Sequence, residues 1–354
     1  MKVYTSVKHC LYFCGAMALC AGPFLPGSAV AEDKVIRITT MNMNEGTDFQ
    51  ELVAAQTPQQ FVAAVTTTFQ NIEATNPTER AAAMARQIAK DRPDLVGLQE
   101  ASIVRTGSAP PATIVQSDLL QSLMLNLKEL GEHYSVIAVV PGLDAEAPST
   151  LGFDVRLTTQ DAIIARTNPN GPALQFSNVQ VQHFSTNLTV PTPTVPIELL
   201  RGWASVDVTY GGQSFRFVTT HLDIVPAIQL AQAQELATKA LNSNLPIILA
   251  GDFNAVASDP TDPTYQAIIA RGFDDAWSIA HPGSPGFTCC QAPNLLNPVS
   301  ALTQRIDLVL FHGEFDVQLI KLTGDHPRDR TSEGLWPSDH AGVHARLTLF
   351  DTNQ

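Results

Sequence analysis

The chain has 354 residues, with 21 lysines and arginines against 34 aspartates and glutamates, and a formal net charge of −13 at pH 7. This acidity argues against a general nucleic-acid-binding surface, because such binding is driven by neutralising phosphates, and leaves only a local cationic patch as a route to it. A chain of this length can bury about three-quarters of its unfolded surface in one large core. No linker, repeat or low-complexity block divides it.

The amino terminus has the three parts of a secretory signal peptide. Lys2 and Lys8 precede or flank the start of an apolar stretch at residues 11–25, and the small-residue pattern Ala-Val-Ala ends at Ala31. This pattern predicts a signal peptide at residues 1–31 and export to the periplasm or the extracellular medium. Residues 32–354 are then expected to form the mature catalytic domain.

Two other functions of this segment are conceivable. A membrane anchor requires about 20 apolar residues, whereas the stretch at residues 11–25 is shorter and contains Pro23. A lipoprotein site at Cys20 would require a small residue where Leu19 stands. Cleavage is therefore the favoured prediction, with no stable membrane anchor in the mature chain.

Cysteine usage excludes a disulfide framework, because three of the five cysteines lie in the predicted signal peptide and only Cys289 and Cys290 remain. Adjacent Cα atoms are about 3.8 Å apart, closer than the roughly 4.4–6.8 Å that disulfides prefer. Two packed thiols or a strained loop clip are therefore favoured over redox catalysis or a metal site.

Segments rich in Val, Ile, Leu and Phe are predicted to be strands, at residues 35–41, 94–99, 134–140, 161–167, 203–210, 214–222, 246–253, 305–311, 315–322 and 342–350. Helical patterns lie at residues 78–91, 117–130 and 227–241, and residues 48–75 are predicted to be an additional helical insertion without an assigned function. These predicted strands are too many for one small sheet. An α/β fold is predicted, a four-layer sandwich of two packed mixed β-sheets flanked by helices.

Polar side chains recur where the predicted strands end or begin, namely Asn42, Glu100, His221, Asp252, Asn254, Asp307, Asp339 and His340. Each alone has an ordinary structural explanation, such as a cap, a turn or a hydrogen-bonded core histidine. Together they match the needs of metal-assisted hydrolysis of a phosphate ester. Carboxylates supply hard ligands, carboxamides bind phosphate oxygens without adding charge, and a histidine held by a carboxylate accepts a proton.

The motifs MNMNEG, GLQE, THLD, GDFN, RID and SDH, in this order, resemble those of the endonuclease/exonuclease/phosphatase superfamily. The resemblance runs from Val35 to about Leu349 and implies a phosphate-ester substrate and Mg²⁺, for which Mn²⁺ can substitute. It implies that Glu100 is the main metal ligand, that Asn42 lies beside the metal and orients Asp252, and that Asp339 supports the metal site.

The same resemblance implies the catalytic roles. His340 would act as the general base or bind the scissile phosphate, with Asp307 accepting its other N–H. Asp252 and Asn254 would position the attacking water and the phosphoryl oxygens, and His221 would stabilise the transition state or assist the leaving group. The choice of histidine or aspartate as the base stays open.

The sequence thus predicts an exported divalent-metal-dependent phosphoesterase that acts on phosphodiesters of small or lipid-borne substrates. A secreted Mg²⁺-dependent nuclease is the alternative, disfavoured by the acidity of the chain. A catalytically inactive binding module of the same fold is the third, and the intact motif set argues against it. The oligomeric state is not indicated.

Overall fold

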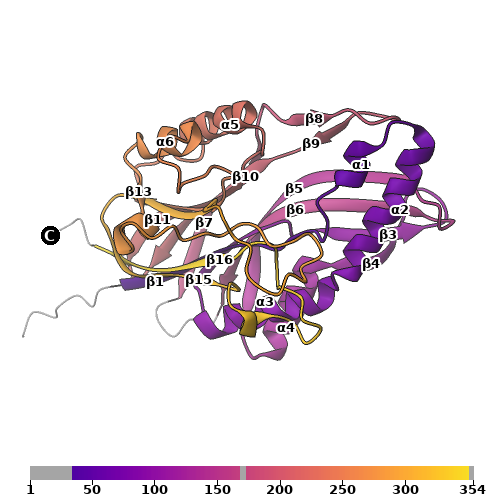
Figure 1. Cartoon of the computed structure of the whole chain (residues 1–354). Helices are drawn as coiled ribbons and strands as arrows, with labels where there is room; N and C mark the ends of the chain where they lie inside the picture. The colour runs from indigo at the N-terminus through magenta and orange to yellow at the C-terminus, as the bar shows by residue number, and fades with distance from the viewer. Residues whose placement is uncertain (1–33, 168–172, 351–354) are drawn as a thin grey trace, which may run out of the picture. The chain divides into compact units, whose positions relative to one another are not determined.

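The computed structural model describes residues 34–167 and 173–350, so the predicted signal peptide at residues 1–31 lies outside the described residues and stays a prediction. Within them, an 8-stranded sheet has the order β15-β16-β1-β2-β6-β3-β4, with β5 paired to β6 (Figure 1). Its strands are β1 (Lys34–Asn42), β2 (Leu95–Gln99), β3 (Ile103–Gly107), β4 (Ile114–Asp118), β5 (Tyr134–Pro148), β6 (Asp154–Arg166), β15 (Phe315–Thr323) and β16 (Gly342–Leu349).

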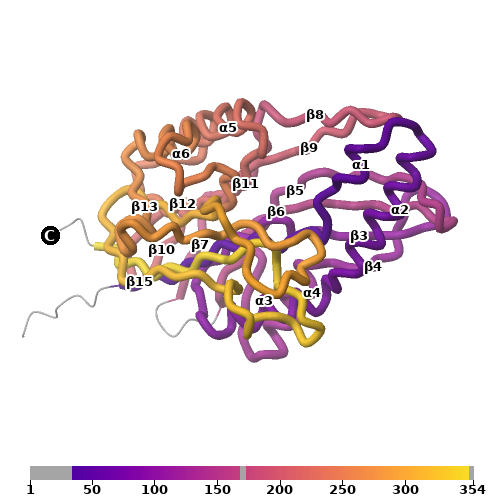
Figure 2. Tube along the Cα trace, in the orientation of Figure 1, coloured from indigo at the N-terminus to yellow at the C-terminus, as the bar shows by residue number. Residues whose placement is uncertain are grey.

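A 6-stranded sheet has the order β13-β14-β12-β11-β10-β7. Its strands are β7 (Leu174–His183), β10 (Gly202–Tyr210), β11 (Gln213–His221), β12 (Ile247–Asp252), β13 (Asp274–Asp275) and β14 (Asp307–His312). A separate two-stranded sheet joins β8 (Leu188–Val190) and β9 (Ile197–Leu199). In Figure 2 the first strand, in indigo, runs beside yellow strands from the end of the chain, because β1 pairs with β16.

The helices are α1 (Gln50–Ala54), α2 (Pro58–Ala74), α3 (Pro77–Asp91), α4 (Leu119–Glu129), α5 (Pro226–Thr238), α6 (Pro263–Ile269) and α7 (Ala276–Ala280), and a 3₁₀ turn, η1, covers Pro327–Asp329. Local sequence explains their starts. Proline stands at the first turn of α2 and α3, and the side chains of Thr57 and Asn76 accept hydrogen bonds from backbone N–H groups there. None of the helices in the described part of the chain is long and apolar enough to cross a membrane.

Three layers of apolar contact hold the elements together. Between the sheets, residues such as Ile36 and Ile38 of β1 belong to one buried cluster with Phe215 and Phe217 of β11. Helices α3 and α4 cover the outer face of the larger sheet, and α5 and α6 cover that of the smaller one (Figure 1). The predicted four-layer sandwich of two mixed sheets flanked by helices is confirmed.

Several elements differ from the prediction. The insertion at residues 48–75 is indeed helical, as α1 and α2, and α2 packs through Phe61, Val65 and Ile72 against the region of β3 and β6. Strands β5 and β6 are longer than predicted because they pair with each other along most of their lengths. Strands β3, β4, β7, β8, β9 and β13 are absent from the prediction, since their faces are largely exposed or their runs short.

Strand direction brings the predicted site residues to one edge. Strand β1 is parallel to β2, with Asn42 opposite Gln99, and β11 is parallel to β12, with His221 opposite Asp252. Parallel strands end at the same edge of a sheet. Strand β14 is antiparallel to β12 and begins there, with Asp307 opposite Asp252.

A buried histidine in β16 makes the stability of the fold depend on pH. His344 is 0% exposed, and burial lowers its pKa from 6.5 to about 4. The unfolded chain binds this proton below pH 6.5 but the folded protein only near pH 4. The contribution of neutral His344 to the stability of the fold is therefore fully present above pH 6.5 and is lost as the pH falls towards 4.

We expect this group alone to lower the free energy of unfolding by roughly 2 kcal/mol between pH 7.5 and pH 5. Urea titrations at the two pH values should show that His344→Gln removes this part of the decline. The exposed His133→Gln serves as the control and should keep the wild-type slope. Equal slopes in all three proteins would contradict the assignment.

Candidate active site

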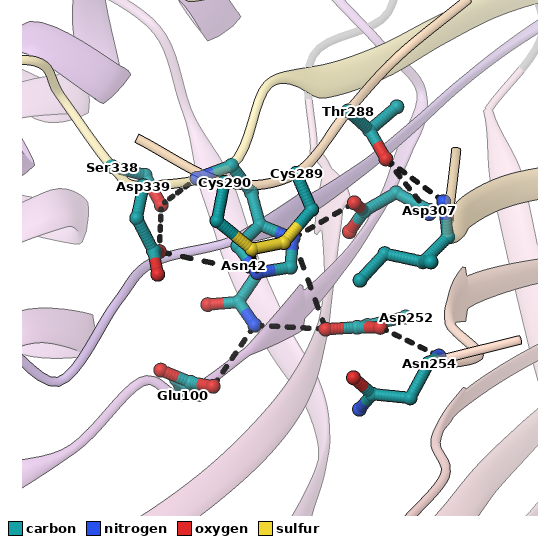
Figure 3. Close-up of a disulfide and its surroundings, with 12 residues drawn as sticks. Asn42, Glu100, Asp252, Asn254, Thr288, Cys289, Cys290, Asp307, Ser338 and Asp339 are labelled. Carbon is teal, nitrogen blue, oxygen red and sulfur yellow. Dashed lines mark hydrogen bonds and ion pairs between the residues drawn. A yellow bond between two sulfur atoms is a disulfide. The ribbon is translucent and has the colours of Figure 1, made fainter. Parts of the chain in front are cut away.

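Asn42, the last residue of β1, connects carboxylates that come from the two sheets. Its Nδ2 donates to Glu100 Oε1 at 3.0 Å and to Asp252 Oδ2 at 3.0 Å, while its Oδ1 accepts from the Asn44 N–H at 2.9 Å. Figure 3 shows the Asn42 side chain between the two carboxylates. Since all three polar positions of the carboxamide are used, its orientation is determined.

Glu100 follows β2 directly and has a left-handed backbone, with φ 55. Its own N–H donates to Asp161 Oδ1 at 3.1 Å, and its Oε2 accepts from the Glu45 N–H at 3.0 Å. A left-handed conformation is uncommon for glutamate and occurs often at functional sites. The half-buried carboxylate is thus aimed by its backbone and held by two N–H donors.

Asp252 ends β12 and is 1% exposed. Its Oδ1 accepts from the Asn254 N–H at 2.9 Å, and Asn254 Nδ2 donates to the Leu222 carbonyl at 2.9 Å. Burial favours the neutral acid, but the imidazoles of His221 and His340 outweigh burial and lower the pKa of Asp252. Asp252 is therefore a carboxylate at neutral pH.

His340 is 8% exposed and pairs with Asp307, the first residue of β14. Their Nδ1 and Oδ2 atoms are 2.8 Å apart, and the Asp307 N–H donates to Thr288 Oγ1 at 3.1 Å. Burial alone would lower the pKa of His340, but the carboxylates of Asp307 and Asp339 outweigh it and raise that pKa well above 6.5. The other ring nitrogen, Nε2, faces Cys290 and Asp339.

Asp339 lies on the other side of the imidazole, with Oδ1 3.9 Å from His340 Nε2. Burial, and then the Glu100 carboxylate, raise the pKa of Asp339. A cation bound near Glu100 and Asp339 would offset the repulsion between these two carboxylates. All eight predicted residues are thus joined at one edge, while their roles stay predictions.

The described residues contain two sets of three side chains whose ligand atoms all lie within 4.8 Å of one another. One set is Asp252, Asp307 and His340, and the other is Cys289, Cys290 and His340. Glu100 and Asp339 belong to neither set. The first set offers ligand atoms for a cation. It is an alternative to the predicted set of Glu100, Asn42 and Asp339.

The two cysteines form a disulfide, the loop clip among the predicted alternatives, and Figure 3 shows it next to Asp339. Cys290 Sγ is 3.9 Å from His340 Nε2. The backbone on either side pairs with the His340 segment, because the Gln291 N–H donates to the Asp339 carbonyl at 2.8 Å and the Ala341 N–H donates to the Thr288 carbonyl at 2.7 Å. The clip therefore anchors the segment that carries His340.

Asp161 and Arg201 belong to the site, although neither is among the eight predicted residues. Asp161 Oδ1 lies 3.6 Å from His221 Nδ1, and the Arg201 guanidinium is 2.8 Å from the same nitrogen. Arginine only donates, so Nδ1 accepts and the proton of a neutral imidazole is on Nε2, 3.5 Å from Asp252 Oδ2. Asp161 begins the strand predicted at residues 161–167 but lies inside the longer β6, and none of the six motifs contains it.

Arg80 of α3 is also absent from the prediction, although it connects two loops of the site. It is 0% exposed and donates to the carbonyls of Met43 at 2.7 Å, Asn44 at 2.9 Å and Pro337 at 3.1 Å. The loop after β1 is thereby tied to the segment before His340. In the sequence, Arg80 resembles any charged residue of an amphipathic helix, so only the tertiary structure identifies it.

Comparisons with solved structures agree on the fold. An endonuclease/exonuclease/phosphatase family protein from Leptotrichia buccalis C-1013-b has a TM-score of 0.56 and 18% identity, covering 89% of this chain and 100% of its own. A mannosyl-6-phosphatase from Bacteroides thetaiotaomicron VPI-5482 has a TM-score of 0.52 and 18% identity, with coverage of 89% and 100%. D. rerio TDP2 complexed with single strand DNA product has a TM-score of 0.54 and 16% identity, with coverage of 90% and 100%. No curated protein sequence matches the chain.

A sequence profile gives the family independently of these structures. The profile of the Endonuclease/Exonuclease/phosphatase family matches residues 40–340, which span all eight site residues. Members of this family hydrolyse phosphate esters and generally use a divalent metal. With most of its length matched and its fold shared, the chain belongs to the Endonuclease/Exonuclease/phosphatase family.

Proposed function

We propose that this protein is an exported hydrolase of small or lipid-borne phosphodiesters and that it depends on Mg²⁺ or Mn²⁺. One observation carries the proposal. Asn42 joins Glu100 to Asp252 at the edge where the His340–Asp307 pair lies, so a carboxylate that can bind a cation, a carboxylate that can position water and an imidazole that can transfer a proton are held together.

The residues fit a hard divalent cation. Glu100 and Asp339 offer carboxylate oxygens in a half-buried site, and Asn42 offers a neutral partner beside them. We propose that these three residues hold the ion. When bound, the cation would polarise a phosphoryl oxygen as a Lewis acid.

The other residues bind and move protons. Asp252, ionised and oriented by Asn42 and by the Asn254 N–H, is suited to accept a hydrogen bond from an attacking water. His340 holds Asp307 through Nδ1, so Nε2 is the nitrogen that can take or give a proton. His221 presents Nε2–H towards the same space as Asp252 and can donate to a phosphoryl or leaving-group oxygen.

The overall charge supports a substrate of low charge. The chain has a formal charge of −13, and a polyanion meets this repulsion within a Debye length of roughly 8 Å at physiological salt. A small or lipid-borne phosphodiester carries little charge that the cation would have to offset. A nuclease remains the second candidate, because one of the similar structures contains DNA.

Turnover of purified mature protein on a substrate panel tests the proposal. The panel contains a small phosphodiester, a phosphate monoester, sphingomyelin vesicles and DNA, each with EDTA and with restored Mg²⁺ or Mn²⁺. We expect hydrolysis of the first or third substrate, loss in EDTA and recovery with metal. Full turnover after exhaustive chelation would refute the metal dependence. Efficient DNA cleavage that falls steeply with salt would favour the nuclease.

Export rests on the amino-terminal pattern ending at Ala31. We expect protein recovered outside the cytoplasm to begin at Glu32, as intact-mass measurement would establish. Recovery of a form that retains residues 1–31 in the membrane fraction would favour an anchor instead. The same measurement on material kept in the cytoplasm serves as the uncleaved reference.

A further inference from the structure

A cavity of about 280 Å³ opens between α3, β15 and the η1 region, and none of the eight candidate active-site residues lines it. Its polar walls come from three places in the chain, with Arg86, Gln87 and Lys90 on α3, Lys321 on β15, and Arg328 and Arg330 at η1. This volume is close to the lower end of the roughly 300–1,000 Å³ of small-molecule sites. The cavity is therefore large enough for a small ligand and too small for a polymer.

The charge of the cavity is opposite to that of the chain. Five lysines and arginines line it against two aspartates, Asp325 and Asp329, which leaves an excess of three positive charges. The whole chain has a formal charge of −13. Positive charge gathered in a concave site attracts anions locally, even when the rest of the surface repels them.

Two of these cations are free to bind. Arg86 and Lys90 are exposed, lie four residues apart on the same face of α3, and have no side-chain hydrogen bond or ion pair within the described residues. Lys321 is partly engaged, with Nζ 2.5 Å from Asp91 Oδ1. The Arg328 side chain lies only loosely near Asp329, with Nε and Oδ1 3.9 Å apart.

Two buried donors at the cavity also have no partner. Gln87 is 8% exposed, and its Nε2 makes no hydrogen bond within the described residues, while its Oε1 accepts from Thr323 Oγ1 at 3.4 Å. The Nε of Arg330 is likewise buried and unpaired, although its guanidinium stacks on Trp336 and donates to the Asn297 carbonyl. A buried donor without an acceptor costs free energy of about 1–3 kcal/mol. An acceptor that enters the cavity would satisfy such donors.

We infer that this cavity is a binding site for a small phosphorylated anion, separate from the active site. Arginine forks and lysine ammonium groups bind phosphoryl oxygens by charge-assisted hydrogen bonds, and the amide N–H of Gln87 supplies a neutral donor from the floor. Three excess charges suit a doubly charged phosphoryl group better than a singly charged carboxylate. The inference does not depend on the proposed catalytic activity.

Calorimetric titration of inorganic phosphate into metal-free protein tests the site. We expect saturable binding by the wild type, a loss of more than tenfold in affinity for the Arg86→Glu/Lys90→Glu double variant, and a loss of about tenfold for Gln87→Leu. Gln87→Leu should change the free energy of unfolding little, because Nε2 has no partner within the described residues and the hydrogen bond that Oε1 accepts from Thr323 is long, at 3.4 Å. Arg86 and Lys90 are exposed and Gln87 is uncharged, so all of these variants should fold and can be compared with the wild type.

Two control variants separate the cavity from other anion sites. Arg271→Glu reverses an exposed charge next to α6 on the opposite side of the sandwich, and His340→Ala alters the active site. Both should bind phosphate like the wild type. Absence of saturable binding, or binding lost in His340→Ala and kept in the double variant, would overturn the inference.

Further titrations identify the source of the phosphoryl group. Glycerol phosphate tests a soluble monoester, and phosphatidylglycerol vesicles against phosphatidylcholine vesicles test an anionic lipid headgroup. A phosphoryl compound that binds the wild type but not the Arg86→Glu/Lys90→Glu variant is a ligand of the cavity and supports the inference. If only single-stranded DNA bound in this way, the cavity would belong to a nucleic-acid surface and the inference of a small-anion site would be wrong.

Discussion

Replacement of His340 by alanine is expected to lower kcat/KM on the order of 10²–10⁴-fold, the range of general acid–base catalysis. The ring is held by Asp307 at 2.8 Å and lies beside Asp252 and Asp339, so alanine removes an oriented imidazole whose Nε2 can transfer a proton. Initial rates on the best substrate of the panel, with saturating metal, measure the effect.

The matched control for His340→Ala is His133→Ala, which removes an exposed imidazole without a side-chain contact in the described residues. It should turn over like the wild type. Far-ultraviolet circular dichroism should show that both variants are folded. Wild-type kcat/KM in a folded His340→Ala protein would remove His340 from the chemistry, whatever its position.

Replacement of Glu100 by glutamine should be the second severe change, with a loss of roughly 10²-fold or more, because a Lewis-acid contribution is worth several kcal/mol. The amide keeps the shape of the side chain but removes its negative charge, and it replaces one of the two oxygens that accept from Asn42 Nδ2 and the Glu45 N–H with an NH2 donor. We therefore expect the Mg²⁺ concentration for half-maximal rate to rise. Measuring rate against metal concentration separates this from a purely structural effect.

Stability should move differently from activity in Glu100→Gln. The change removes the repulsion between the Glu100 and Asp339 carboxylates. The free energy of unfolding in EDTA should therefore fall only slightly. Glu129→Gln, an exposed change at the end of α4, is the control and should alter neither rate nor metal dependence. An unchanged metal dependence of Glu100→Gln would assign the ion to Asp252, Asp307 and His340 instead.

The candidate site could be predicted to the extent that its residues lie at strand ends. Asn42, Glu100 and Asp252 each end or follow an apolar run, and parallel pairing carries such ends to one edge. Asp161 stands at the start of the strand predicted at residues 161–167, but no motif contains it, and it meets His221 only through the packing of the two sheets. Arg80 escapes this logic because its acceptors are carbonyls, which no residue type reveals.

The fold was predictable to a similar degree. Strand β12 is buried along its whole length, and its continuous apolar run predicts a strand, whereas β7 has mostly exposed positions and gives no strand pattern in the sequence. The Cys289–Cys290 disulfide lies in the long connection between α7 and β14. The path of this connection places the disulfide beside His340. Sequence spacing alone leaves such a connection undetermined.

The two hydrogen bonds of Asn42 also depend on how the two sheets are aligned. One carboxamide nitrogen reaches a carboxylate that follows β2 and another that ends β12, each at 3.0 Å. If one sheet slid against the other by even one ångström, one of these hydrogen bonds would break, since they weaken steeply with stretching. An aspartate at this position would add repulsion, and a shorter serine would span neither gap. Close packing of the core between the sheets therefore holds Glu100 and Asp252 at a fixed spacing, which sets the precision of the site.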